Sequence, residues 1–114
     1  MKTESSPIPP LTFAATRFAA LGSEQRLTVL RCLVRAGPEG LSMGELGSRT
    51  EVTGSTLTHH LKVLMTAGLV QQERRGRSII CAAVAYDEID ALARFLLTEC
   101  CADAAAPCKD HDHD

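Results

Sequence analysis

Three cysteines lie close together near the C-terminus, at Cys100, Cys101 and Cys108. Thiolates are soft ligands, and three sulfurs without an obligatory fourth partner suit trivalent arsenic or antimony. Adjacent side chains of an ideal helix point about 100° apart, so we expect Cys100 and Cys101 to chelate best where their helix frays. The short, flexible segment before Cys108 would let the chain fold back and supply the third sulfur. This pattern favours a ligand role over incidental or redox thiols.

The remaining sulfur and imidazole groups favour other roles. Cys32 lies beside the apolar stripe of an expected helix and Cys81 within an expected strand, where small buried thiols are common. His111 and His113 could bind a divalent ion weakly, but an exposed acidic tail is the favoured interpretation. An odd number of cysteines, five, without a secretion signal favours thiols or metal ligands over a disulfide framework.

A second group of chemically active side chains follows Thr53, which is a good helix N-cap. Leucines at 57, 61 and 64 recur at helical spacing and give one apolar face. Gly54 leaves the first turn sterically open, and small hydroxyl residues suit close approach to phosphates and base edges. The opposite face carries Ser55, Thr56, Thr58, His59 and Lys62. We interpret this segment as a recognition helix for double-stranded DNA.

The elements around this helix support that interpretation. Ser42 and Glu45 have capping-box spacing and predict a short helix ending between Gly47 and Thr50, with Met43 and Leu46 inward. Two helices separated by a tight turn form a helix-turn-helix.

Two strands are predicted next, at 69–74 and 78–84, joined by a turn with glycine at its bend. Between residues 48 and 78, five basic residues oppose only two acidic ones, although the whole chain has a net charge of −2. Local positive charge attracts phosphates, so the turn could contact the DNA backbone or minor groove. Its basic residues are Arg74, Arg75 and Arg77. The alternative interpretation is a solvated turn.

Helices complete the expected fold on both sides of this motif. Residues 11–21 predict a first helix, and Ser23 caps a second that ends at Gly37 and Pro38. The second helix carries a stripe of Leu27, Leu30, Leu33 and Val34. A final helix is expected from Tyr86 to Cys101. Its stripe is wide enough to predict a dimer seam with the first helix, and comprises Ile89, Leu92, Ala93, Phe95, Leu96 and Leu97.

Length and composition limit the number of domains and the class of protein. With 114 residues, 45% hydrophobic and 23% charged, we expect one domain at 11–101 between a flexible arm, 1–10, and a flexible acidic tail, 102–114. The predicted fold class is mainly α with a small β-hairpin (α+β), a homodimeric winged helix-turn-helix. Without a membrane-spanning run or h-region we expect a cytoplasmic protein. No nucleophile, base or paired-carboxylate pattern suggests an enzyme.

Two sequence stretches resemble the ArsR/SmtB metalloregulators: residues 20–27, and 58–64 followed by 67–70. The resemblance covers about three quarters of the chain. It implies a homodimeric repressor that binds an inverted-repeat operator and releases it when a toxic metal or metalloid binds.

Carried over by position, Ser55, Thr56, Thr58 and His59 would meet the major groove. Lys62 and the three wing arginines would meet phosphates or the minor groove. His60 occupies the family's usual His position, where packing is at least as expected as DNA contact. Gly54 stands where relatives often place Gln, which removes one possible base contact.

The inducer site departs from the best-known members of this family. Residues 41–46 contain no cysteine, whereas those arsenic sensors place Cys-x-Cys in the third helix. Residues 86–101 contain no His, which the family's zinc sensors use. Some members sense arsenite through a C-terminal cysteine cluster, so Cys100, Cys101 and Cys108 are expected to bind As(III), Sb(III) or a methylated trivalent arsenical. Two alternatives stay open: a redox or persulfide switch on the same fold, and a metal-sequestering or protein-interaction module that does not bind DNA.

Overall fold

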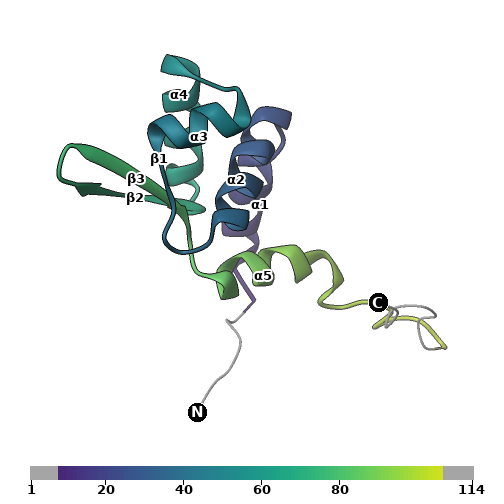
Figure 1. Ribbon diagram of the computed structural model, residues 1–114. Helices are drawn as coiled ribbons and strands as arrows, with labels where there is room; N and C mark the ends of the chain where they lie inside the picture. The colour runs from purple at the N-terminus through teal and green to yellow at the C-terminus, as the bar shows by residue number, and fades with distance from the viewer. Residues whose placement is uncertain (1–7, 107–114) are drawn as a thin grey trace, which may run out of the picture.

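The structure is a computed structural model that describes residues 8–106, so Cys108, His111, His113 and most of the predicted arm and tail lie outside the described residues. A small antiparallel sheet lies at one side of the helices, and its β2–β3 hairpin projects away from them (Figure 1). The elements in chain order are α1 (Leu11–Ala20), α2 (Glu24–Ala36), β1 (Leu41–Ser42), α3 (Met43–Thr50), α4 (Gly54–Thr66), β2 (Val70–Arg75), β3 (Ser78–Ala83), α5 (Tyr86–Arg94) and the 3-10 turn η1 (Phe95–Leu97). The predicted winged helix-turn-helix is confirmed.

Local signals explain how the helix-turn-helix begins. The Glu45 amide donates to Ser42 Oγ at 3.1 Å and the Ser42 amide donates to Glu45 Oε1 at 3.0 Å, which is the predicted capping box. These bonds lower the pKa of the Glu45 carboxyl, with the Ser42 backbone N–H as the largest cause. Thr53 does occupy the N-cap of α4, but its side chain makes no capping hydrogen bond. Gly54 has a φ of 62°, a left-handed conformation that favours glycine.

The sheet contains one strand more than predicted. Its order is β1-β3-β2, and Leu41 pairs with Cys81 while Ser42 pairs with Ile80. A two-residue strand carries no periodicity by which a sequence could reveal it. Gly40 allows the approach, because a Cβ at that position would lie 2.3 Å from the Cys81 carbonyl oxygen.

The core is built from aliphatic side chains of the helices together with the sheet. Its largest fully buried side chains are Val29, Leu33, Leu46, Leu61, Leu64, Leu69 and Cys81. The predicted stripe of α2 is only half correct, since Leu30 and Leu33 are buried but Leu27 and Val34 are 42% and 46% exposed. Val29 takes the inward position instead. These two exposed side chains belong to a separate apolar surface described below.

The prediction that the last helix reaches Cys101 was wrong. The α-helix ends at Arg94, one 3-10 turn follows, and residues 98–103 form successive turns. Leu96 and Leu97 are 76% and 66% exposed, so this segment gains little packing energy within one protomer. The Thr98 hydroxyl also donates to the Phe95 carbonyl at 3.1 Å, which competes with continuation of the helix.

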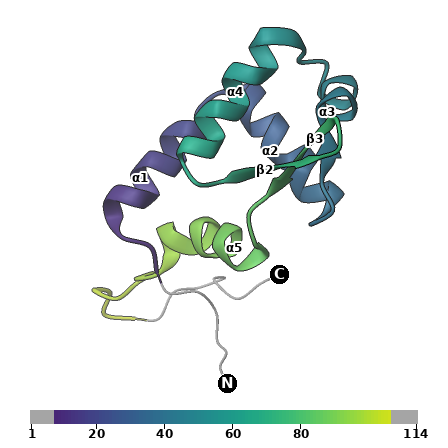
Figure 2. The same ribbon diagram turned by 90° about the vertical axis from the view of Figure 1, so that its left-hand side faces the viewer.

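Recognition helix α4 and the C-terminal turns lie at opposite ends of the molecule (Figure 2). Helix α5 lies between these two ends and crosses beneath α1 and α2. Within residues 8–106, no helix is both long and apolar enough to cross a membrane.

Candidate nucleic-acid interface and thiol site

Helix α4 presents a polar face to solvent. Leu57, Leu61 and Leu64 are buried against the core, as their spacing predicts. The five predicted contact residues, Ser55, Thr56, Thr58, His59 and Lys62, are all exposed. A hollow of about 350 Å³ beside them reaches towards α1 and is lined in part by His59, Lys62 and Thr16. The Thr58 hydroxyl donates to the Gly54 carbonyl at 3.3 Å and keeps its acceptor capacity. The exposed face therefore carries polar groups of the kind that read base edges and phosphates.

His60 faces inward and fastens α4 to α2. It is 9% exposed, and its Nε2 lies 2.8 Å from Gln25 Oε1, while Arg26 Nη1 lies 3.4 Å from its Nδ1. A neutral ring that donates from Nε2 and accepts at Nδ1 satisfies both contacts. Burial lowers the pKa of His60, and the nearby Arg26 and His59 lower it further. Of the two roles considered for His60, packing and DNA contact, its burial and its contacts with α2 agree with packing.

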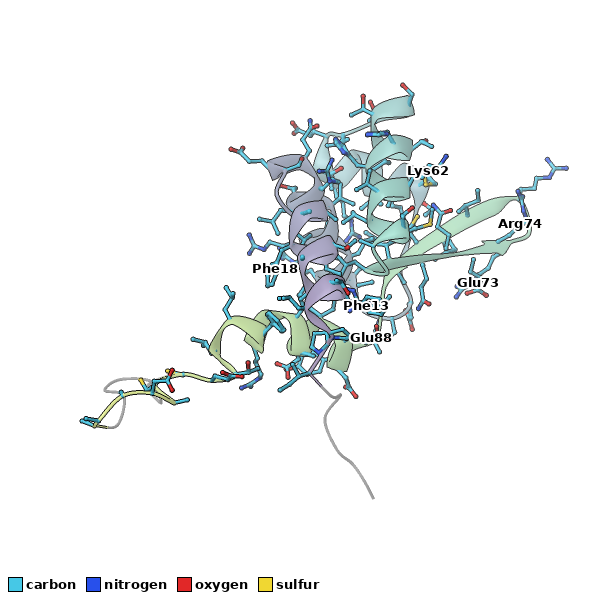
Figure 3. The ribbon with its side chains drawn as sticks, turned by 180° about the vertical axis from the view of Figure 1, so that it is seen from behind. Phe13, Phe18, Lys62, Glu73, Arg74 and Glu88 are labelled. Carbon is cyan, nitrogen blue, oxygen red and sulfur yellow. The ribbon has the colours of Figure 1, made fainter. Side chains whose placement is uncertain are left out.

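The wing carries its arginines into solvent, but they are not equivalent. Arg75 Nη2 lies 3.3 Å from Glu73 Oε1 on the same strand, and both side chains are more than half exposed. Arg74 points outward on the side that Lys62 shares, and Glu73 points to the other side of the hairpin (Figure 3). Side chains alternate along a strand, so Glu73 lies on the same side as Arg75 and opposite Arg74. The sequence-based site did not include Glu73, although this carboxylate sets Arg75 apart from Arg74.

Cys100 and Cys101 come together in the turns after η1. Their Sγ atoms lie 3.6 Å apart, and both residues are exposed. Cys101 has a φ of 63°, so the backbone departs from the helical progression that would separate the two side chains. Cys108 lies outside the described residues. Within residues 8–106, no group of three or more His, Cys, Asp or Glu side chains could hold a metal ion.

The thiols predicted to be structural lie elsewhere. Cys81 is fully buried, with its Sγ 3.6 Å from Met43 Sδ and 3.4 Å from Gln72 Nε2. Burial raises the pKa of the Cys81 thiol, which disfavours the reactive thiolate. Cys32 is partly buried and packs against the core.

An apolar surface is exposed on α1, α2 and the α5–η1 segment. A hollow of about 440 Å³ lies between these elements and is lined by Phe18, Leu27, Val34, Ile89 and Leu92, among others. Phe18 and Phe95 pack at its side with ring centroids 6.5 Å apart. The same elements carry further large apolar side chains in solvent. Those between 36% and 77% exposed on α1, α2 and the α5–η1 segment are Leu11, Phe13, Phe18, Leu27, Val34, Tyr86, Leu96 and Leu97. Such a patch marks a protein-interaction surface.

Comparison with known proteins agrees with this architecture. Residues 21–73 match a helix-turn-helix domain family. The HTH-type transcriptional regulator YceK of Bacillus subtilis is 38% identical over 61 residues, which are 54% of this chain and 60% of that relative. The chain thus matches less than two thirds of that relative's length.

Solved structures extend the similarity over most of the fold. An ArsR-like transcriptional regulator from Rhodococcus sp. RHA1 is 30% identical with a TM-score of 0.65, over 81% of this chain and 82% of that one. The chain belongs to the ArsR/SmtB family. This ArsR/SmtB chain is also similar to the homodimeric winged helix-turn-helix DNA-binding domain of a possible ArsR-family regulator from Mycobacterium bovis. That domain has 25% identity and a TM-score of 0.61, over 82% of this chain and 81% of that one. Both the family and the fold are those of transcriptional regulators.

Proposed function

We propose that the protein is a dimeric repressor that binds operator DNA and releases it when a trivalent metalloid binds its C-terminal cysteines. The exposed polar face of α4 beside a basic wing is the observation that carries the DNA-binding half of this proposal. In a helix-turn-helix the second helix enters the major groove. Ser55, Thr56, Thr58 and His59 would contact base edges. Lys62, Arg74, Arg75 and Arg77 would contact phosphates or the minor groove.

The apolar surface of α1, α2 and α5–η1 supports a homodimer. The hollow within it is lined by side chains from α1, α2 and α5. A second copy that buries the same surface would remove these side chains from water and set the separation of two recognition helices. The homodimeric relative from Mycobacterium bovis has the same fold.

Cys101 is disulfide-bonded in the structure, so a shared ion requires its prior reduction. The separation of the Cys100 and Cys101 sulfurs is compatible with one such ion. Two sulfurs bound to a single ion at about 2.3 Å cannot be more than about 4.6 Å apart, and these Sγ atoms are separated by 3.6 Å. Thiolates prefer soft ions, which supports As(III) or Sb(III). Cys108 would supply a third sulfur for the inorganic ions, whereas a methylated arsenical needs only two.

Little energy is required for release. A coupling free energy of about 1–3 kcal/mol changes affinity roughly 5- to 150-fold. The cysteines follow the α5–η1 segment directly, so a change in its docking would move the two recognition helices relative to each other.

A gel shift with DNA from upstream of the gene tests both halves of the proposal. We expect wild-type protein to bind selectively and to lose the DNA when reduced protein is treated with arsenite. The variant with Cys100, Cys101 and Cys108 all changed to Ser should bind equally well but not be released. Cys32→Ser is the matched control, because it removes a thiol away from this site, and it should respond like wild type.

Other outcomes identify the competing functions. Release by the triple variant would refute the assignment of the inducer site. Release by peroxide or polysulfide but not by arsenite would identify a redox or persulfide switch. Absence of salt-sensitive, selective DNA binding would indicate a sequestering or interaction module. Titration of Cys108→Ser with each ligand would separate inorganic ions from methylated arsenicals.

A further inference from the structure

Arg17 of α1 caps the C-terminal end of the recognition helix. Its Nε donates to the Ala67 carbonyl at 3.0 Å, and its Nη2 donates to the Gly68 carbonyl at 3.4 Å. The last carbonyls of a helix have no partners within that helix and carry its negative dipole end, which favours a cation there. Arg17 is mostly buried, with 15% of its side chain exposed.

The backbone at this end of α4 is shaped to receive the guanidinium. The Gly68 amide donates to Met65 O and the Leu69 amide to Leu64 O, both at 2.9 Å, which is a Schellman motif. Gly68 has a φ of 80°, and a Cβ there would lie 2.9 Å from Arg17 Nη2. The backbone conformation therefore favours glycine, and a larger residue would also displace the Arg17 guanidinium from this position.

The same guanidinium is also tied to α5. Arg17 Nη2 lies 3.4 Å from Glu88 Oε1, in the first turn of that helix. Figure 3 shows Glu88 where α5 passes beneath the first half of α1. One side chain thus touches the end of the DNA-facing helix and the start of the helix that leads to the cysteines.

We propose that Arg17 is a positioning residue that couples α5 to the recognition helix, and that its ion pair with Glu88 transmits the movement of α5. When α5 moves, Glu88 draws Arg17 away from the Ala67 and Gly68 carbonyls, and the end of α4 loosens. This coupling between α5 and the end of α4 depends only on contacts within one protomer. Its use in regulation rests on the proposed function.

Hydrogen exchange on the full-length, DNA-free protein tests the coupling independently of DNA or metalloid. Glu88→Gln keeps the shape of the side chain and removes its charge. We expect the amides of Gly68 and Leu69 to exchange roughly two- to fivefold faster, as loss of a partly exposed ion pair allows. Arg17→Gln should accelerate them about tenfold. Asp87→Asn is the matched control: it makes the same change one residue earlier in the same helical turn and should leave these amides unchanged.

The double variant distinguishes coupling from general loosening. Glu88→Gln should have no further effect once Arg17→Gln is present, because its influence passes through that side chain. An unchanged exchange rate in Glu88→Gln, or an equal change in Asp87→Asn, would overturn the proposal. So would additive effects in the double variant.

Operator release then tests the regulatory use. Glu88→Gln should reduce the loss of DNA affinity caused by arsenite roughly threefold relative to wild type and Asp87→Asn. Normal release by Glu88→Gln despite faster exchange would overturn the regulatory role and leave a structural cap. Failure of arsenite to release wild type would refute the proposed inducer while the exchange result stands.

Discussion

His60 is a buried polar side chain that holds helix α4 against α2. The exposed side chains of α4 depend on this placement. The two ring nitrogens of His60 contact Gln25 and Arg26, and both contacts are made from α2. Protonation would place a positive ring against the Arg26 guanidinium and remove the acceptor at Nδ1. The neutral form is thus part of the folded structure.

The lowered pKa of His60 has a consequence for stability. Between the folded pKa and the unfolded value of 6.5, the unfolded chain binds more protons, so stability rises with pH and falls as acid is added. We expect the melting temperature to be insensitive to this group well above pH 6.5 and to decrease as the pH falls below that value. His60→Gln should flatten this dependence, whereas His59→Gln should flatten it much less, because His59 is the smallest of the causes that lower the His60 pKa. The measurement is thermal unfolding at pH values above and below 6.5, and identical slopes in both variants would contradict the role.

The wing arginines allow a second comparison between single residues. Arg74→Gln should weaken operator binding and lower the salt dependence by about one charge. Arg75→Gln should cost less, because Arg75 already pairs with Glu73. Glu73→Gln should strengthen binding by releasing that arginine. Gel shifts at several salt concentrations measure all three, and equal losses for both arginines with no gain for Glu73→Gln would refute the distinction.

At the scale of elements, the N-terminal signals of helices act as local stabilisers. The capping box of α3 satisfies amides that the helix leaves without partners, and it sets where the helix-turn-helix begins.

Loss of this cap is therefore expected to destabilise the protein. Ser42→Ala should lower the free energy of unfolding by about 1 kcal/mol, within roughly 0.5–2 kcal/mol. Ser48→Ala, at an exposed position of the same helix, is the control and should change it little. Denaturant unfolding gives both values, and an equal effect at the two serines would show that the cap contributes nothing particular.

In contrast to the capped start of α3, the end of α5 at Arg94 is not marked by a glycine or proline in the sequence. Among the described residues beyond Arg94, only Phe95 packs against the core, while Leu96 and Leu97 are 76% and 66% exposed. The cysteine pair consequently lies in turns, where adjacent side chains can converge.

At the scale of the whole molecule, the exposed apolar side chains of α1, α2 and α5–η1 mark a surface that a second copy would cover. The residues that line its hollow come from α1, α2 and α5 and include none of the predicted DNA-contact residues of α4.

A charge within this surface should separate the proposed dimer. Val34→Glu places a carboxylate where a partner would otherwise cover an apolar side chain, and uncompensated burial of charge costs several kcal/mol. We expect dimer affinity to fall roughly 100-fold or more. Thr28→Glu, on the same helix but outside the apolar hollow, is the control. Sedimentation equilibrium measures the effect, and an unchanged dimer would exclude this surface as the interface.

Sequence by itself determined the features that depend on near neighbours. Helical spacing of leucines, the capping box at Ser42 and the glycine-bearing turn after Arg75 predicted the helix-turn-helix and wing, because these signals act within a few residues. The same spacing placed the polar residues of α4 on one exposed face. The fold class could be predicted for this reason.

Tertiary structure decided what depends on contacts between distant segments. Strand β1, the exposure of Val34, the end of α5 and the pairing of Arg17 with Glu88 all arise from packing across the chain. Such contacts leave no local pattern, since their partners are separated by tens of residues. The sequence thus specified the DNA-facing element, and the fold specified what holds that element in place.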